Sequence, residues 1–202
     1  MSLFEGSRLA VLDTETTGLD PNQGHAVIVV ACVTLVGGEI GETWSTLVNP
    51  GRPIPPEAAA VHGITDAMVR GAPAPDAVAA ELDARCAGRT LVFHNAAFDL
   101  PFLAVLMRRG GRTPLANPVV DTFGLAVGLF GPGGNSLSAR AGHFGLPAET
   151  AHRATGDART TARLLLKLAQ RWEDERGVRT VAELAAASQD ALRLNPRRPR
   201  PV

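Results

Sequence analysis

Several features that usually assign a chain to a protein class are missing or scarce in these 202 residues. The formal net charge at pH 7 is zero, so the chain is not a globally basic nucleic-acid binder. The two cysteines, Cys32 and Cys86, are too isolated for a disulfide framework or a C-x-x-C zinc site, and we expect reduced, buried thiols. Tyrosine is absent, which excludes a phenol from any catalytic role.

The sequence also lacks the signals of membrane insertion and export. Its longest apolar run, residues 26–36, is too short to span a bilayer. No basic segment followed by an apolar core stands at the N-terminus, so we expect no signal peptide. These absences predict a soluble, cytoplasmic protein that does not act at a membrane.

Apolar runs and turn residues predict an α/β chain, and 202 residues are enough for one such domain. Three strands separated by turns form an expected antiparallel meander, and later strands alternate with helices. This order predicts a mixed five-stranded sheet flanked by helices. The expected strands are 8–12, 26–36, 40–48, 90–94 and 118–120, and the main expected helices are 75–87, 96–109, 122–130, 136–144, 156–172 and 181–192.

The organised pattern covers residues 7–172, which we expect to form the main domain. Residues 173–202 are expected to hold one helix and a Pro/Arg-rich tail that is partly disordered. The last ten residues contain four arginines, three prolines and no acid, so a basic arm that binds nucleic acid is the alternative interpretation of the tail.

Two carboxylates one residue apart, Asp13 and Glu15, follow the apolar run 8–12. In a strand they project from the same face, because residues i and i+2 point the same way. Such a pair repels unless a cation lies between its members, and Mg²⁺ and Mn²⁺ prefer oxygen ligands of this kind. The alternative is a pair of solvated acids on a polar strand face, and the pair alone does not exclude it.

Asp99 follows the strand 90–94 and lies near the start of the helix 96–109, where we expect Pro101 in the first turn. Binding sites of open α/β sheets gather at strand ends, so Asp99 can reach the edge that holds Glu15. Its alternative role is to cap its own helix.

A further acid, Asp157, heads the inward stripe of the long helix, where a carboxylate is costly to bury unless it is paired or bound to metal. We expect Thr155 to cap this helix and His152 to lie on the loop before it. The reason is that two residues five positions apart, about 500° around a helix, cannot share a face. The rest of the stripe consists of Thr161, Leu164 and Leu168.

Together these segments resemble the three motifs of the DEDDh (DnaQ-like) 3′–5′ exonucleases, most closely the exonuclease domain of the epsilon subunit of bacterial DNA polymerase III. The resemblance covers roughly residues 7–172, and three individually weak motifs in the family's order make it specific. The second strand lacks the acid that the family often has there, but that acid is not a metal ligand. The motifs are Asp13-x-Glu15, His94-Asn95-x-x-Phe98-Asp99 and His152-x-x-x-x-Asp157, with support from 61–65, Asp121-Thr122, 135–137 and 144–146.

The resemblance implies a ribonuclease H-like fold and hydrolysis with two Mg²⁺ or Mn²⁺ ions. Asp13, Glu15 and Asp157 would hold one ion, Asp13 would also bind the second, and Asp99 would complete the acidic set. His152 would be the general base, and the absence of tyrosine excludes the sister subclass with Tyr at that position. The product would be a nucleoside 5′-monophosphate. Residues expected to hold the terminal nucleotide are Thr16, Thr17, Gly18, Leu19, Val61, His62, Asn95 and Phe98.

The residues leave substrate and assembly open. We expect a proofreading or repair enzyme whose partner is single-stranded DNA with a free 3′ end, but the same chemistry serves an exoribonuclease. A silent module that binds nucleic acid or a polymerase is the third hypothesis, and the intact catalytic set argues against it. No polymerase-docking signature follows Trp172, which favours a stand-alone enzyme over a polymerase complex.

The expected structural roles are a turn for His25, a strand-end hydrogen bond for His94, a helix surface for His143 and core packing for Phe98.

Overall fold

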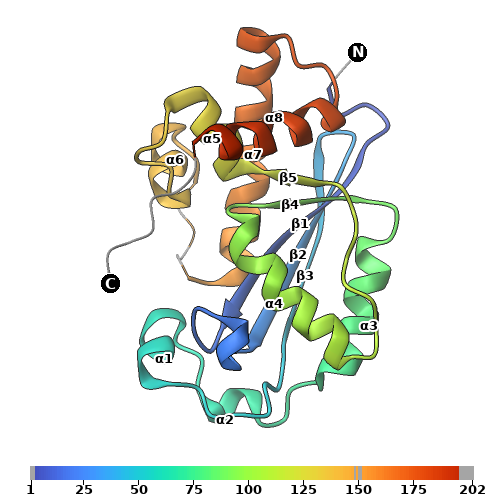
Figure 1. Cartoon of the computed structure of the whole chain (residues 1–202), viewed down its shortest axis with the longest axis vertical. Coiled ribbons are helices and arrows are strands. Elements are labelled where there is room, and N and C mark those ends of the chain that lie inside the picture. The colour runs from blue at the N-terminus through green and yellow to red at the C-terminus, as the bar shows by residue number, and fades with distance from the viewer. Residues whose placement is uncertain (1–2, 148, 150–151, 196–202) are drawn as a thin grey trace.

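A mixed sheet of five strands forms the centre of the protein (Figure 1). The computed structural model describes residues 3–147, 149 and 152–195. Strand β2 is antiparallel to β1 and β3, whereas β1, β4 and β5 run parallel, which confirms the predicted mixed sheet and its meander. The strands, in the spatial order β3-β2-β1-β4-β5, are β1 (Arg8–Thr16), β2 (Val27–Val36), β3 (Glu39–Leu47), β4 (Thr90–Phe93) and β5 (Val119–Asp121).

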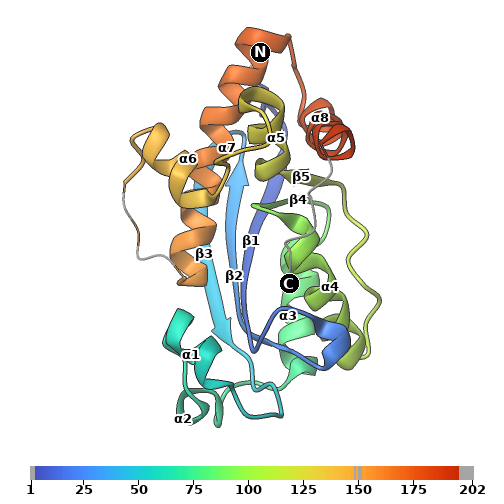
Figure 2. The same ribbon diagram turned by 60° about the vertical axis from the view of Figure 1, so that its left-hand side comes forward.

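Helices cover both faces of this sheet, as Figure 2 shows, and short helices lie at the end where β1 stops. No helix among the described residues is long and apolar enough to cross a membrane. The helices are η1 (Pro21–Gln23), α1 (Pro56–His62), α2 (Asp66–Val69), α3 (Pro75–Cys86), α4 (Ala96–Arg109), α5 (Thr122–Phe130), α6 (Leu137–His143), α7 (Ala154–Arg176) and α8 (Val181–Leu194).

Alternation along β1 assigns its side chains to two separate layers. Leu9 packs in the cluster that includes α7, whereas Leu12, on the other face, packs with α3 and α4. Because alternate residues of a strand face opposite sides, Asp13 and Glu15 belong to the α7 side and Thr14 to the α4 side. The core therefore determines which helix can bring a partner to each of these three residues.

The C-terminal helix α8 packs on α5 at the end of the sheet opposite α1 and α2 (Figure 1). A Cβ atom at Gly124 of α5 would lie 2.3 Å from the carbonyl oxygen of Ser188, so only glycine permits this approach. The Ser188 hydroxyl also accepts a hydrogen bond of 3.1 Å from the amide of Asp121. Helix α8, which lies beyond residue 172, is thus packed onto α5 and β5, and the division at 172/173 stays a prediction.

Two predicted helix details are wrong. Helix α7 begins at Ala154 with Arg153 as its N-cap residue, so Thr155 lies inside the helix. Pro101 lies in the second turn of α4 rather than the first. The helix tolerates it there because Ala97, whose carbonyl loses its hydrogen bond, is exposed to solvent.

The C-terminal segment differs in part from the expected tail. Helix α8 continues to Leu194, so the first two residues of the segment expected as tail are helical. Residues 196–202, which hold most of the predicted Pro/Arg-rich tail, lie outside the described residues. Cys32 and Cys86 are free and buried, as expected, and burial raises their thiol pKa values to about 11 and about 12.

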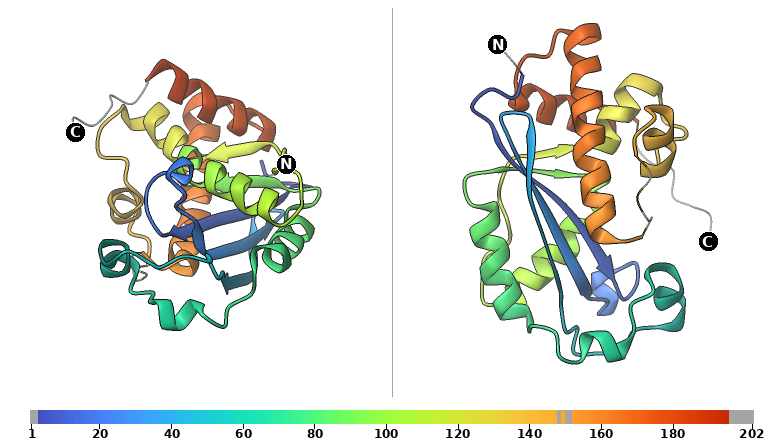
Figure 3. Two further views of the ribbon diagram at one scale, coloured as in Figure 1. Left: turned by 60° about the horizontal axis from the view of Figure 1, so that its bottom comes forward. Right: turned by 180° about the vertical axis from the view of Figure 1, so that it is seen from behind.

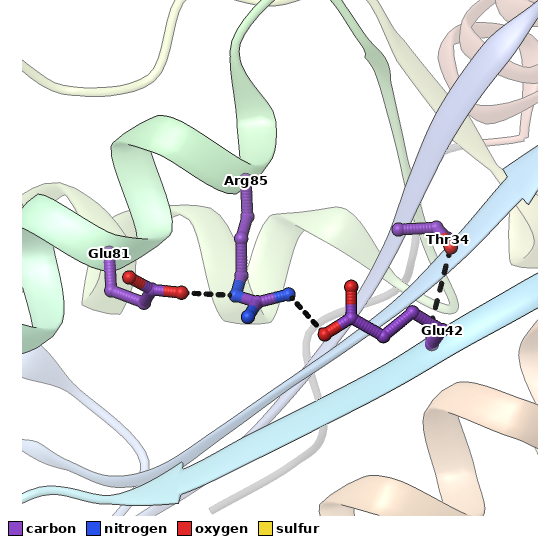
Figure 4. A network of polar contacts seen from close by, with 4 residues as sticks. All are labelled: Thr34, Glu42, Glu81 and Arg85. Carbon is purple, nitrogen blue, oxygen red and sulfur yellow. Dashed lines mark hydrogen bonds and ion pairs between the residues drawn. The ribbon is translucent and has the colours of Figure 1, made fainter.

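Arg85 links helix α3 to the edge strand β3 by hydrogen bonds and ion pairs (Figure 4). Its Nε donates to Glu81 at 2.7 Å on the same helix, and its Nη1 donates to Glu42 of β3 at 3.1 Å. Its guanidinium also lies 4.8 Å from the centre of the Trp44 ring. Charged side chains on an edge strand hinder pairing with a further chain, so this contact protects the open edge of the sheet.

Candidate active site

Three carboxylates converge at the end of β1. Asp13 and Glu15 project from one face of the strand, and Asp157 comes from the first turn of α7, which packs on that face. One oxygen atom of each lies within 4.8 Å of the others. Helix α7 therefore supplies a third acid to the strand pair, as its predicted inward stripe requires. The other residues of that stripe are buried: Thr161, Leu164 and Leu168.

Burial and mutual repulsion raise the pKa values of all three acids. Burial raises the pKa of Asp13 well above its usual range, and three neighbouring carboxylates raise it further. The pKa of Glu15 is raised to about 7, first by burial and then by the charge of Asp157, while Arg153 acts in the opposite direction. Burial also raises the pKa of Asp157. A divalent cation would relieve both the repulsion and the desolvation, so this donor set fits Mg²⁺ or Mn²⁺.

Asp99 reaches the same end of the sheet from α4. Its Oδ1 accepts hydrogen bonds from the amide of Thr14 at 3.1 Å and from the Thr14 hydroxyl at 2.7 Å. Burial raises the pKa of Asp99 to about 7, and the two bonds from Thr14 oppose that rise. Its carboxylate thus binds to β1 and adds to the charge around Asp13, as the first of its two interpretations requires.

Asp121, at the end of β5, holds the turn from β4 into α4. Its buried carboxylate accepts hydrogen bonds from the amides of Asn95 at 2.9 Å, Ala96 at 3.0 Å and Phe123 at 2.9 Å. Asn95 has a φ of 84°, in the left-handed region, so this turn depends on such bonds. In the sequence Asp121 is only part of a supporting segment. An acid between a strand end and a helix start is the signal that identifies its capping role.

His152 lies on the loop immediately before α7, as predicted. Its φ of 56° is left-handed, and its amide donates to Oδ2 of Asp157 at 2.9 Å. The next residue, Arg153, was not predicted: its guanidinium donates to the carbonyl oxygen of His62 at the end of α1. A Cβ atom at Gly63 would lie 3.1 Å from that guanidinium. The loop with the candidate base is therefore tied to the loop expected to hold the substrate.

A cavity of about 830 Å³ connects these elements. Its apolar residues Leu19 and Val61 are 83% and 55% exposed, which leaves apolar surface available to a ligand. Phe98 is half-buried against Phe102, with ring centres 5.2 Å apart, so it combines core packing with a place in the cavity wall. All predicted residues line this cavity: Asp13, Glu15, Thr16, Thr17, Gly18, Leu19, Val61, His62, Asn95, Phe98, Asp99, His152 and Asp157.

The histidines outside the acidic cluster have structural partners. His94 contacts the Thr122 hydroxyl and the Asn135 carbonyl, each at 2.9 Å, which confirms the predicted strand-end hydrogen bonds. His62 is 2% exposed, and its Nδ1 accepts a hydrogen bond of 3.1 Å from the amide of Ile64. Burial lowers the pKa of His62, so it faces the cavity as a neutral ring near pH 7. His143 has its predicted place on an exposed helix surface, whereas His25 comes just after the turn at Gly24, where its Nδ1 accepts a hydrogen bond of 3.2 Å from the amide of Asp20, and it lines the cavity.

Comparison with known proteins finds relatives for most of the chain. A family model described as Exonuclease (RNase_T) matches residues 10–165. DNA polymerase III subunit epsilon of Treponema pallidum is 35% identical over 166 residues, which cover 81% of this chain and 77% of that protein. A DNA polymerase III subunit epsilon-like protein of Rhodobacter capsulatus is 45% identical over 163 residues, covering 78% of this chain and 23% of that protein.

Solved structures give the same fold. The structure of Exonuclease X in complex with 5′ overhanging duplex DNA is similar with a TM-score of 0.69 at 31% identity, covering 89% of this chain and 99% of that one. The nuclease domain of 3′hExo, a DEDDh family member, has a TM-score of 0.71 at 18% identity, covering 82% of this chain and 92% of that one. The chain spans only a minor part of some relatives, 23% of the R. capsulatus protein and 12% of the PolC-type DNA polymerase III of Thermotoga petrophila.

Proposed function

We propose, from the premise that this chain belongs to the RNase_T family of exonucleases and is DnaQ-like, that it removes nucleoside 5′-monophosphates from the 3′ end of DNA. The observation that carries the proposal is the convergence of three carboxylates from β1 and α7 beside His152 in one cavity. Carboxylates with pKa values raised by burial and repulsion are costly for a purely structural role. In a metal-dependent phosphodiesterase these carboxylates have a function, because they hold the metal.

The acidic residues hold the metal in this proposal. Asp13, Glu15 and Asp157 would hold one Mg²⁺ or Mn²⁺, Asp13 would also bind a second ion, and Asp99 would complete the set. Two such ions, when bound, stabilise the charge on the attacking and leaving oxygens of a phosphodiester. Asp99 contributes through its position: fixed by Thr14, it keeps a fourth negative charge near Asp13.

His152 is the proposed general base. It precedes α7, its side chain lines the cavity, and its amide is bound to Asp157. A ring nitrogen in that place would take the proton of the attacking water. The hydrogen bond from Arg153 to the His62 carbonyl limits the freedom of this loop and so keeps His152 beside Asp157.

The terminal nucleotide is proposed to lie between the segment 16–19 and the end of α1. The exposed side chains of Leu19 and Val61 offer apolar contact to a base, which accepts any base because every base has an apolar face. We choose DNA over RNA as the proposed substrate for two reasons. Exonuclease X, 31% identical, was solved with DNA, and relatives of this chain are DNA polymerase III subunits. The DNA polymerase III relatives support assembly into a non-covalent polymerase complex.

One assay tests the proposal. Single-stranded DNA and RNA oligonucleotides of the same sequence, labelled at either end, are incubated with Mg²⁺ or with a chelator, using the wild-type chain and Asp13→Ala. We expect mononucleotide release from the 3′ label of DNA, stepwise shortening of 5′-labelled DNA, and no product with chelator or Asp13→Ala. Release from the 5′ end, or undiminished turnover by Asp13→Ala, would overturn the mechanism. Faster degradation of RNA than of DNA would show that RNA is the substrate.

A further inference from the structure

The outward side of α7 carries a stripe of cations. Between residues 158 and 172 the helix has four basic residues and no acid, although the whole chain has no net charge. Successive members are four residues apart, which is about 6 Å along the axis and about 40° around it, so they form a continuous diagonal stripe about 18 Å long. We call these residues, with Arg140 of the adjacent α6, the α7 basic face: Arg159, Arg163, Lys167, Arg171 and Arg140.

Much of this charge has no counterpart within the described part of the chain. Arg159 and Lys167 are exposed and make no ion pair among the described residues. Arg163 pairs with Glu149 at 2.8 Å, and Arg171 pairs with Glu175. Two of the four α7 cations in the stripe are therefore free to bind an external anion.

The far end of the stripe brings two guanidinium groups to one aromatic ring. Arg140 lies 4.0 Å and Arg171 lies 5.0 Å from the centre of the Phe130 ring. Among the residues that the structure describes, Arg140 hydrogen-bonds the neutral oxygens of Asn135 and Gly133 and no carboxylate. Like charges so placed repel each other, and phosphate is a ligand that guanidinium groups bind well.

The stripe starts near the N-terminal end of α7, on the side of the helix opposite Asp157, because two residues correspond to about 200° around a helix, and it leads away from the end that holds the candidate active site. Arg159 comes two residues after Asp157, and Lys167 lies ten residues after it, about 15 Å along the helix axis. Figure 3, in its view from behind, shows the outer side of α7 uncovered along its length. A strand whose 3′ end occupies the cavity reaches this face by passing around the N-terminal end of α7.

We propose that the α7 basic face binds the phosphodiester backbone of the nucleic acid strand whose 3′ end is being cut, several nucleotides upstream of the cut. The inference rests on the proposed exonuclease function and extends it. Phosphate contacts of this type are independent of sequence, depend on salt, and suit an enzyme that must accept every base. A dinucleotide in the cavity cannot reach Lys167, so the face acts only on longer strands.

The experiment compares Arg159→Glu/Lys167→Glu with the control Arg8→Glu/Arg108→Glu, which makes the same change in net charge. The control residues are exposed and lie on the α4 side of the sheet and on α4 itself. Steady-state hydrolysis with Mg²⁺ is measured on a dinucleotide and on DNA of about 20 nucleotides. We expect the α7 variant to raise KM for the long strand about tenfold and to leave dinucleotide hydrolysis unchanged. The slope of log binding constant against log salt concentration should become less steep by about 1.4, which is about 0.7 for each lost phosphate contact.

Each outcome has a separate meaning. Equal KM values for the two double variants on the long strand, with thermal melting unchanged in both, overturn the α7 basic face. Poly-glutamate that competes for the face as well as DNA does would also overturn it, because the partner would then be an acidic polypeptide. Failure to hydrolyse even the dinucleotide refutes the exonuclease proposal, while equilibrium binding of the long strand still tests the face. The milder Lys167→Gln repeats the test if the charge reversal impairs folding.

Discussion

The carboxylate of Asp99 accepts two hydrogen bonds from Thr14, one from the amide and one from the hydroxyl. Pairing between β1 and β4 stops at Val11 and Val92, so the amide of Thr14 has no strand partner on that side. Asp99, from the first turn of α4, provides the missing acceptor. An acid from one layer of the fold is thereby fixed next to Asp13, whose side chain faces the other layer.

This contact predicts the effect of Thr14→Val. The variant keeps the shape of the side chain but removes the hydroxyl that holds Asp99. Loss of such an outer partner typically weakens metal binding about 10-fold to 100-fold, so we expect the Mg²⁺ concentration for half-maximal rate to rise about tenfold. Thr14→Ser, which keeps the hydroxyl, is the control and should resemble the wild type. A Mg²⁺ requirement that is the same in both variants contradicts the role of this hydrogen bond.

Replacement of Asp13 and of His152 should separate metal binding from proton transfer. Asp13→Ala removes a ligand, so we expect loss of both activity and Mn²⁺ binding. His152→Ala removes only the base, and we expect kcat to fall about 10²-fold to 10⁴-fold while Mn²⁺ affinity stays the same. Titration calorimetry with Mn²⁺, combined with steady-state kinetics, measures both. If His152→Ala loses Mn²⁺ binding as Asp13→Ala does, the histidine acts on the metal site and not as a base.

The acids of the site could be predicted because their chemistry is local. Asp13 and Glu15 share a strand face by simple alternation, and Asp157 heads a stripe with helical spacing. Contacts between distant segments could not be predicted in this way. Arg153 lies 91 residues from His62 in sequence, and Asp121 lies 26 residues from Asn95, so no periodicity connects either pair.

The start of α7 shows where propensity misleads. Threonine is a favoured N-cap residue, which makes Thr155 the reasonable choice from sequence. In the structure the carboxylate of Asp157 accepts the amide hydrogen of His152, so the chain turns earlier and Arg153 becomes the cap. The order of the strands likewise had to come from the structure, because β4 inserts between β1 and β5 by packing that no local pattern encodes.

Arg153 is predicted to have two separable effects. Its tie to the His62 carbonyl holds the loop of His152, so Arg153→Ala should lower kcat about tenfold, the loss typical of misplaced catalytic groups, with little change in KM. Its charge lowers the pKa of Glu15, so the same variant should move the acidic limb of the pH–rate profile to higher pH. Arg153→Lys restores the charge but not the guanidinium geometry.

The lysine variant therefore distinguishes the two effects. We expect Arg153→Lys to recover the wild-type pH profile while kcat stays low, and the melting temperature of both variants to stay close to that of the wild type. Full recovery of kcat by lysine would show that only the charge of Arg153 is important. A fall in melting temperature that accompanies the loss of kcat would indicate a general structural role instead.

The metal-free protein should lose stability as pH rises through neutrality. The pKa values of Glu15 and Asp99 are raised to about 7, and that of Asp13 is also raised, whereas the same groups titrate near pH 4 when unfolded. Between about pH 4 and pH 7 the folded state holds more protons than the unfolded state, so the free energy of unfolding decreases as pH increases. Mg²⁺ opposes this loss because it binds the ionised acids, and its stabilising effect should grow with pH.

Melting temperatures from about pH 5 to about pH 8, with chelator and with Mg²⁺, should show both trends, and Asp13→Asn should weaken both. A chelator melting curve that rises over this range by the same amount in wild type and Asp13→Asn would show that these carboxylates are not strained in the folded protein.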